Sequence, residues 1–357
     1  MTEAATLREL LDLARWAPSG DNTQPWRFEI LGDDHVAVHG HDTRTHVLYD
    51  FDGHASHMAH GALLETLRIA ATGFGLKASW TWREGTPDSA PIYDVRLVPD
   101  PAATASPLIP AIRKRSVQRR MMTSPSLSGH ERQALLEAVG EGYSLRFFET
   151  RGERMRVARL LWDNAGLRLT CPEAYPVHRD VIEWNARFSL DRIPDQAVGV
   201  DPLTARLMQW VMQRWERVEF FNRYLGGTIL PRVQLDLLPA IACSAHLLLV
   251  AETPPRELAD YVRAGQAMQR LWLTVTSLGL QLQPEMTPVI FRWYARSGRA
   301  ISRRPGIDEG ARRLAERFEG IACAEPTTPF VFFCRIGGGA APTARSLRKP
   351  LDDLMVA

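Results

Sequence analysis

Residues 17–28 read APSGDNTQPWRF and lie between two regular elements. Before them, leucines at positions 7, 10, 11 and 13 have the spacing of an amphipathic helix, predicted over residues 6–16. Pro18 and Gly20 end that helix, and WRFEIL at 26–31 reads as a strand. We therefore predict a rigid loop whose small side chains let a flat ligand approach the backbone, although such a turn is most often only a turn.

The rest of the chain alternates apolar helical and strand-like segments, which predicts an α+β fold. Residues 99–110, PDPAATASPLIP, read as a linker. Residues 151–235 are expected to be largely helical. Further helices are predicted at 58–78, 129–139 and 261–284, and further strands at 35–41, 92–98, 144–150, 240–252 and 329–337.

Two segments repeat with a constant offset of 204 residues. HGALLETLRIAATGFGLKA starts at His60 and AGQAMQRLWLTVTSLGLQL starts at Ala264, so that Gly61 aligns with Gly265. LLDLARW…WRFEI also resembles LLEAVGE…LRFFE, and DVRLV resembles FVFFCRIG, in the same order. Several ordered matches predict a duplication, with halves at 1–107 and 108–357 and a helical insertion at about 151–235 in the second.

The two predicted halves are not equal. The first carries the loop at 17–26, where the second has only GEGY. The second begins with the basic run IRKRSVQRR, and its segment 113–120 could bind a phosphate through Arg115, Ser116 and Arg119, joined by Arg345 and Arg348. A basic run after a linker is more often solvated surface. If each half has kept one motif, the chain holds one composite site.

Composition excludes several classes of function. The chain has 43 basic and 41 acidic residues, a net charge of +2, which argues against a nucleic-acid partner. Its four cysteines form no C-x-x-C motif, as expected in a reducing compartment. The N-terminus does not read as a signal peptide, and the longest apolar run, about 237–250, is too short to span a membrane. We therefore expect a cytoplasmic protein without a membrane partner.

Three further features have both a functional and a structural interpretation. His54, His57 and His60 could share a helical face and bind a metal, but they are more readily explained as a polar helix start, and no metal site is predicted. The aromatic segment 203–225 is either a packing helix or a wall over a ligand. His178 could reach an active site, although a lone histidine is more often structural.

Taken together, these motifs resemble the FMN-dependent nitroreductase superfamily, in its double-length branch. LLDLARWAPSGDNTQPWRFEI is similar to that family's A-P-S-x-x-N-x-Q-P-W element, and IRKRSVQRR to its R-R-S-x-R phosphate segment. AGQAMQRLWLTVTSLGLQLQPEM is similar to its long central helix and flavin-edge loop, and FVFFCRIG…TARSLRKPL to its terminal strand and basic tail. The resemblance covers most of the chain and is weak across 151–235.

The resemblance implies two fused halves that mimic the family's homodimer, each a mixed sheet packed by helices, with one FMN per chain. A monomeric pseudo-dimer is implied, and further self-association is possible. The role of Ser116 depends on how the segment is aligned with the family motif, because an alternative alignment puts Val117 at the hydroxyl position. Arg115 and Arg119 match arginine positions of the motif in both alignments. The implied flavin-binding residues are Pro18, Ser19, Gly20, Asn22, Arg115, Ser116, Arg119, Arg345 and Arg348, with backbone groups of Pro284, Glu285 and Met286 near flavin N5.

The implied activity is ping-pong hydride transfer from NAD(P)H through flavin N5 to a nitroaromatic, a quinone or a similar small acceptor. No side chain need act as an acid or base, so none is named as catalytic. Two alternatives stay open: a biosynthetic flavin-dependent dehydrogenase, and a flavin-binding or storage protein whose closed site does not turn over.

Overall fold

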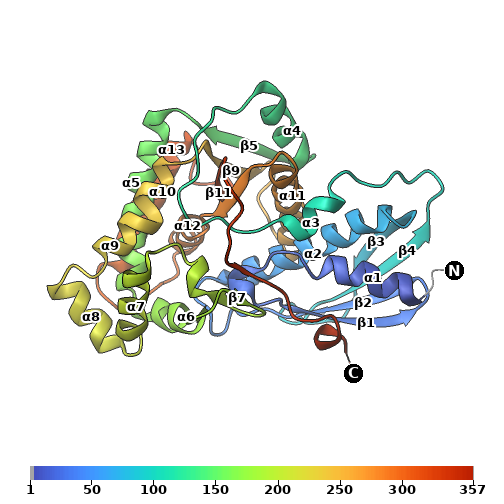
Figure 1. Cartoon of the computed structure of the whole chain (residues 1–357), viewed down its shortest axis with the longest axis horizontal. Coiled ribbons are helices and arrows are strands. Elements are labelled where there is room, and N and C mark those ends of the chain that lie inside the picture. The colour runs from blue at the N-terminus through green and yellow to red at the C-terminus, as the bar shows by residue number, and fades with distance from the viewer. Residues whose placement is uncertain (1–3, 357) are drawn as a thin grey trace.

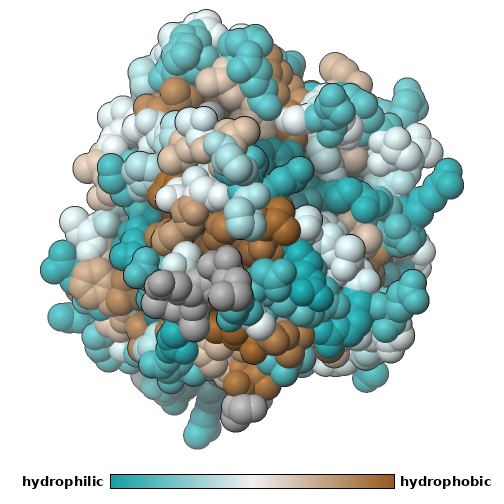
Figure 2. Space-filling model, turned by 90° about the vertical axis from the view of Figure 1, so that its right-hand side faces the viewer, coloured by the Kyte–Doolittle hydropathy of each residue, from teal (hydrophilic) through white to brown (hydrophobic). Residues whose placement is uncertain are grey.

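The structure, a computed structural model, describes residues 4–356. The first half contains a four-stranded antiparallel sheet in the order β1-β2-β4-β3, with the long helix α2 packed against it (Figure 1). Figure 2 shows this end of the molecule, where hydrophilic residues interrupt the hydrophobic areas. The elements of the first half are α1 (Ala4–Ala14), β1 (Trp26–Gly32), β2 (His35–Gly40), α2 (His54–Thr72), β3 (Leu76–Trp82) and β4 (Ile92–Pro99).

The second half contains a sheet of the same topology. Its strand order, read from the β5 edge, is β5-β9-β11-β10. In both sheets the four strands thus occur in the order first, second, fourth and third along the chain. The α+β class is confirmed, and the shared order supports the predicted duplication. The elements are α4 (Gly129–Val139), β5 (Tyr143–Phe148), β9 (Ala245–Ala251), α11 (Leu258–Ser277), β10 (Gln281–Pro284) and β11 (Phe330–Gly337).

Helices α2 and α11 pack against each other more extensively than any other helix pair in residues 4–356. A Cβ atom on Gly61 would lie 1.9 Å from the carbonyl oxygen of Val262, and one on Gly265 would lie 2.0 Å from that of Met58. These contacts are equivalent, because an offset of 204 converts 58 and 61 into 262 and 265. The repeated glycines therefore let two helix backbones touch around an approximate two-fold axis.

Polar contacts along the same helices follow the same relation. Arg270 lies 3.4 Å from the Glu65 carboxylate, and the Gln269 amide donates to Thr66 Oγ1 at 2.8 Å. With the offset of 204, Glu65 corresponds to Gln269 and Thr66 to Arg270. The Glu65–Arg270 contact of one half is therefore equivalent to the Gln269–Thr66 contact of the other. The halves thus meet as two subunits of a symmetric dimer meet.

The second half differs from the first by two insertions. The hairpin between β1 and β2 is replaced by residues 149–244 between β5 and β9, a segment that includes the helical insertion predicted at about 151–235. A second insertion, α12 and α13 between β10 and β11, was not predicted. The inserted elements are α5 (Arg151–Thr170), α6 (Tyr175–Asp180), β6 (Ile182–Glu183), β7 (Phe188–Ser189), β8 (Ile193–Pro194), α7 (Pro202–Val211), α8 (Trp215–Tyr224), α9 (Ile229–Arg232), α10 (Leu238–Ile241), α12 (Thr287–Ser297) and α13 (Ile307–Ala322).

Two predicted helices are too long. The helices expected at 58–78 and 261–284 end at Thr72 and Ser277, and each is followed by an edge strand, β3 or β10. Gly75 and Gly279 end the turns in left-handed conformation, with φ of 66° and 75°. The reason is that the apolar residues after each glycine pair with a neighbouring strand, which single-sequence periodicity does not reveal.

Extended segments connect the two halves at both sheets. The linker leads into α3 (Ile109–Lys114), after which Val117 forms a parallel bridge with Leu282 at the edge of the second sheet. The C-terminal segment passes through β12 (Arg345–Ser346) and returns to the first sheet, where Val356 N–H donates to Phe28 O at 2.8 Å. We predicted mixed sheets, with both parallel and antiparallel strands. The strand ladders of both four-stranded sheets are antiparallel, and within residues 4–356 their parallel pairing occurs only at the isolated bridges Val117–Leu282 and Phe28–Met355.

Candidate flavin site

A cavity of about 690 Å³ lies where the two halves and the large insertion meet. Its size is that of a cofactor or small-molecule site. The structure brings all twelve residues predicted to bind the flavin to its walls, from four separate segments of the chain. They are Pro18, Ser19, Gly20, Asn22, Arg115, Ser116, Arg119, Pro284, Glu285, Met286, Arg345 and Arg348.

The loop at 17–26 is ordered by contacts from the second half. Asp21, Asn22 and Gln24 have positive φ, between 50° and 64°, a conformation that surrounding contacts must hold in place. The buried Gln24 side chain donates to Leu190 O at 2.8 Å and accepts from Lys349 N–H at 2.9 Å. An insertion residue and a tail residue therefore fix the loop of the first half, which explains its rigidity.

Four cavity-lining arginines, Arg115, Arg119, Arg345 and Arg348, form no ion pair with a carboxylate among residues 4–356. Arg115 is 3% exposed and Arg348 is 7% exposed. Burying a guanidinium without a counter-charge is unfavourable unless an anion compensates it. This part of the cavity therefore has the electrostatic character of an anion site.

The arginines are held mainly by carbonyl oxygens. Arg348 donates to Ala17 O at 2.8 and 3.0 Å and to Asn22 Oδ1 at 2.7 Å, which joins the tail to the loop. Arg115 donates to Trp16 O at 2.9 Å and lies over the Trp272 ring. Burial lowers the pKa of Arg348 to about 9, with Arg345 contributing, and lowers that of Arg115.

The Arg115 and Arg345 Nε atoms are buried and have no hydrogen-bond partner within residues 4–356. Phosphate oxygens accept such N–H groups well, so the residues present fit a phosphate-bearing group. Arg119 donates to Ala197 O at 3.3 Å, and burial lowers its pKa to about 10 while Asp21 opposes the shift. Ser116 and Val117 both line the cavity, so the two registers of this segment both stay possible.

Residues 284–286 lie at the junction of β10 and α12. The Glu285 N–H already donates to Phe333 O at 2.8 Å, and its buried carboxylate lies between His246 Nδ1 at 2.7 Å and Arg335 at 2.9 Å. His246 Nε2 faces Ala240 O at 2.9 Å, so both ring nitrogens face acceptors and the imidazole is doubly protonated. The Glu285 side chain thus supports the cavity wall from behind.

A second polar cluster lines the cavity away from the predicted phosphate residues, and most of it was missed from the sequence. Tyr49 Oη lies 2.7 Å from His178 Nε2, which joins the first half to α6. Arg168 on α5 makes only a 3.5 Å contact with Asp236. Burial raises the pKa of Asp236 to about 6 and lowers that of His178 to about 3. Only His178 had been noted, because no sequence spacing relates the others.

The insertion supplies most of the apolar lining. The aromatic segment 203–225 forms the two short helices α7 and α8, in which Thr204 is the only buried residue. Inward residues form a wall of the cavity, as the second interpretation required. They are Leu207, Met208, Val211, Met212, Trp215, Val218, Phe221 and Leu225.

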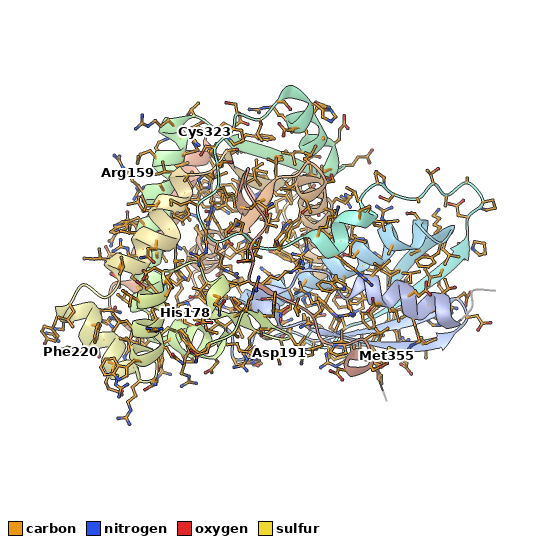
Figure 3. All side chains as sticks on the ribbon, viewed as in Figure 1. Arg159, His178, Asp191, Phe220, Cys323 and Met355 are labelled. Atoms are coloured by element: carbon orange, nitrogen blue, oxygen red, sulfur yellow. The ribbon has the colours of Figure 1, made fainter. Side chains whose placement is uncertain are left out.

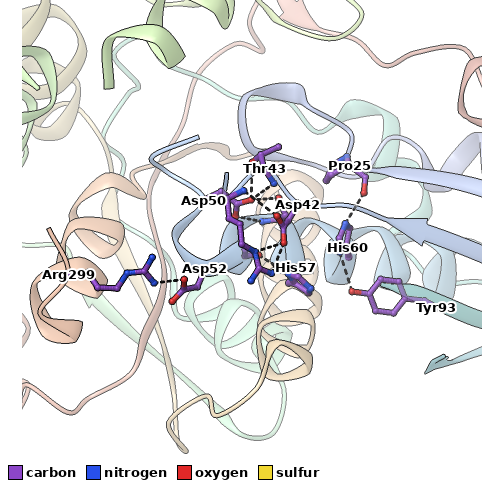
Figure 4. A network of polar contacts seen from close by, with 12 residues as sticks. Pro25, Asp42, Thr43, Asp50, Asp52, His57, His60, Tyr93 and Arg299 are labelled. Carbon is purple, nitrogen blue, oxygen red and sulfur yellow. Dashed lines mark hydrogen bonds and ion pairs between the residues drawn. The ribbon is translucent and has the colours of Figure 1, made fainter. Parts of the chain in front are cut away.

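The clustered histidines of the first half are structural. His60 is fully buried, its Nε2 donating to Pro25 O at 2.7 Å and its Nδ1 lying 3.1 Å from Tyr93 Oη (Figure 4). Burial lowers the pKa of His60 to about 3, so the ring is neutral. The expected polar helix start is therefore wrong, because His57 and His60 belong to the core. Within residues 4–356 no group of three or more potential ligands is arranged to hold a metal ion.

Sequence comparisons agree with the resemblance drawn from the motifs. The Nitroreductase family model matches residues 2–44, which include the loop at 17–26. "Putative NAD(P)H nitroreductase Rv3131" of Mycobacterium tuberculosis is 27% identical over 293 residues, 80% of this chain and 78% of that protein. The resemblance to the nitroreductase family is confirmed.

Two further relatives come from the same organism and carry no functional name. "Uncharacterized protein Rv3127" is 26% identical over 279 residues, 77% of this chain and 76% of that protein. "Uncharacterized protein MT1398" is 25% identical over 287 residues. That match covers 78% of this chain but only 38% of the relative, which is therefore a much longer protein.

Solved structures similar to this chain include the FMN-dependent nitroreductase NfnB of Mycobacterium smegmatis in complex with NADPH. It has 14% identity and a TM-score of 0.38, covering 70% of this chain and 97% of that chain. A nitroreductase with bound FMN from Desulfitobacterium hafniense has 14% identity and a TM-score of 0.37, covering 71% of this chain and 100% of that chain.

Proposed function

We propose that the chain is an FMN-dependent oxidoreductase that holds one flavin in the cavity between its halves. The observation that carries the proposal is the set of four cavity-lining arginines without a carboxylate partner among residues 4–356. A dianionic phosphate is the kind of group that would compensate them. The family resemblance supports FMN as the molecule that carries this phosphate.

The residues have separate roles in this proposal. Arg115, Arg119, Arg345 and Arg348, with Ser116, hold the phosphate. Pro18, Ser19, Gly20 and Asn22 border the ring system from the first half, and residues 284–286 border it from the second. When bound, FMN supplies hydride transfer from NAD(P)H to a nitroaromatic, a quinone or a similar small acceptor.

The second polar cluster would orient the acceptor. Tyr49 and His178 present a hydroxyl and a neutral imidazole to the cavity, and Arg168 presents a weakly paired guanidinium. The Tyr49–His178 pair keeps one N–H or O–H to donate to a nitro or quinone oxygen, and Arg168 can donate another, while the walls from α7 and α8 contact an apolar ring.

The direct test is the visible spectrum of the purified chain, followed by titration with FMN and anaerobic addition of NADPH. We expect one FMN per chain and bleaching of the flavin band by NADPH. Two bound flavins would contradict the composite site. One flavin that NADPH cannot bleach would favour a flavin-storage protein. This is the second candidate function, because the insertion helices α7 and α8 line the cavity and could close it to NADPH.

Arg119→Ala tests the phosphate contact. It should weaken FMN binding by about tenfold to a hundredfold, because a charge-assisted hydrogen bond contributes about 1.5–3 kcal/mol. Arg120→Ala is the matched control, since Arg120 is exposed and does not line the cavity. Equal FMN affinities of the two variants would remove Arg119 from the site.

A further inference from the structure

The segment from α7 to α10 carries an unusual concentration of exposed apolar side chains. Residues 4–356 contain sixteen large apolar side chains that are strongly exposed, and nine of them fall within residues 203–238. One tenth of the chain thus holds more than half of these side chains, which scattered exposure does not produce. We call it the α7–α10 patch: Leu203, Leu207, Trp210, Phe220, Tyr224, Leu225, Ile229, Leu230 and Leu238.

The helices of this patch line the cavity with some of their apolar residues and expose others on the outer surface. In α7 the buried residue is Thr204, whereas Leu203, Leu207 and Trp210, at helical spacing, are 75%, 47% and 48% exposed. No residue of α8 is buried, and Phe220, in the middle of this helix, lies at the far left of Figure 3. Such helices have an apolar face that nothing within residues 4–356 covers.

Basic residues surround the apolar face. Residues 203–238, the span of the patch, contain five arginines, two glutamates and one aspartate, a local charge of +2. Arg217 lies over the Trp210 ring at 4.3 Å, and Arg223 lies over the Tyr224 ring at 5.3 Å. Arginines beside outward aromatic residues, on short amphipathic helices, are typical of segments that lie in the interface of an anionic membrane.

The α7–α10 patch is continuous with the cavity. Leu207, Leu225 and Leu230 are 47%, 59% and 47% exposed and also line the cavity wall. An apolar molecule that leaves a bilayer under this patch would therefore stay in contact with apolar side chains on its way inward.

We propose that the α7–α10 patch docks on the surface of a lipid bilayer that carries anionic headgroups, and that a lipophilic acceptor enters the cavity from there. Docking needs no flavin, whereas the entry of an acceptor rests on the proposed oxidoreductase function. Docking departs from the sequence-based expectation that the protein has no membrane partner. It is peripheral, because no helix of residues 4–356 is long and apolar enough to cross a membrane.

The test is flotation of the intact chain with vesicles of phosphatidylcholine and phosphatidylglycerol in a 7:3 ratio, compared with pure phosphatidylcholine vesicles. We expect flotation with the anionic vesicles only, and its loss in high salt as the Debye length falls from about 10 Å to about 3 Å. Equal flotation with both vesicles, or none with either, would overturn the proposal.

The variant Leu203→Ser/Phe220→Ser/Tyr224→Ser changes exposed residues that do not line the cavity. It should weaken vesicle binding at least about thirtyfold, since apolar burial drives insertion. Val98→Ser/Leu136→Ser, at 47% and 40% exposure outside the patch, is the matched control and should float normally. If the control and the patch variant lose binding alike, the assignment to this patch is wrong.

Arg206→Glu/Arg214→Glu tests the charge contribution and should abolish flotation with anionic vesicles. A second copy of the chain is the competing occupant. If the chain does not float but forms a concentration-dependent dimer that the patch variant abolishes, the α7–α10 patch binds a second copy of the chain and not a membrane. The proposed oxidoreductase is tested separately by FMN titration, so a chain that floats without binding FMN would retain the docking and lose the enzyme.

Discussion

The two halves of this chain share a sheet topology and a long central helix, and they differ in the loops and insertions around them. Both sheets have the same strand order, and α2 and α11 meet through equivalent glycines. Only the first half has the loop at 17–26, and only the second has the basic segment and the helical insertions. The comparison teaches that the symmetric part supports the assembly, while the asymmetric parts build one site.

The largest expected effect comes from breaking the symmetric contact. Gly61→Ala and Gly265→Ala each place a methyl group about 2 Å from the backbone of the other helix. Because only a shift of the helix backbones can relieve this contact, each should destabilise the fold by about 3 kcal/mol, the upper end of the usual cost of overpacking. Thermal unfolding measures this loss, and the pseudo-two-fold relation predicts similar values for the two variants.

Gly320→Ala is the matched helical control for these variants. Gly320 lies in α13, and a Cβ atom there would meet nothing within 4 Å. Alanine should therefore be neutral or stabilise the fold by up to about 1 kcal/mol. A large loss at only one of Gly61 and Gly265 would show that the crossing is not symmetric.

The halves also differ in the charge of a buried histidine. His60 of the first half is neutral, with its pKa lowered to about 3, mainly by burial. His246 of the second half is charged: burial opposes its charge, but Glu285 raises its pKa to about 10. An unfolded histidine titrates near pH 6.5, so the two residues should affect stability on opposite sides of that value.

The signs follow from proton binding. Below about pH 6.5 the unfolded state binds a proton that buried His60 does not, so acid weakens the fold through His60. Above about pH 6.5 the native state retains the proton on His246, so stability falls as pH rises toward about 10. Each contributes up to about 1.4 kcal/mol per pH unit.

Differences between the wild type and a variant isolate these contributions, because other titrating groups such as Asp236 cancel. His60→Gln should flatten the acid limb of the unfolding temperature against pH, and His246→Gln the alkaline limb. Both variants are expected to be less stable overall, so the slope is the measurement. An unchanged alkaline slope in His246→Gln would mean that His246 is neutral.

If the four arginines form an anion site, one substitution there should lower FMN affinity without lowering the stability of the flavin-free protein. Arg115→Met removes a guanidinium that is 3% exposed and has no carboxylate partner among residues 4–356. The protein without flavin should be no less stable, while FMN affinity should fall at least about tenfold. Unfolding temperature and FMN titration give both values, and a loss of stability without loss of affinity would make Arg115 structural.

The sequence predicts the symmetric part and the site motifs better than the insertions. The loop at 17–26 and the arginines of 113–120 are local motifs. Their spacing alone favours an ordinary turn and a solvated surface, and it is the resemblance to a known family that assigns them to a flavin site. Tyr49, Arg168 and Asp236 come from three separate elements and meet only through tertiary packing. β3 and β10 were included in helices because strand pairing, a non-local property, overrides the local pattern.

The smallest expected effect concerns the hydrogen bond that joins the first half to the insertion. Tyr49 Oη lies 2.7 Å from His178 Nε2, and the ring centroids lie 5.6 Å apart. Tyr49→Phe keeps the ring and removes only the hydroxyl, so it should cost about 1 kcal/mol. His178→Asn and the double variant complete a thermodynamic cycle, in which we expect a coupling of about 1 kcal/mol.

This coupling distinguishes two descriptions of the asymmetric part. If the insertion is held on the first half by specific polar contacts, the two single losses will not add, because each removes the same hydrogen bond. If the insertion rests there only through apolar packing, the losses will add. Repeating the cycle with FMN bound would then show whether the flavin strengthens that connection, since Tyr49, His178 and the predicted flavin residues line one cavity.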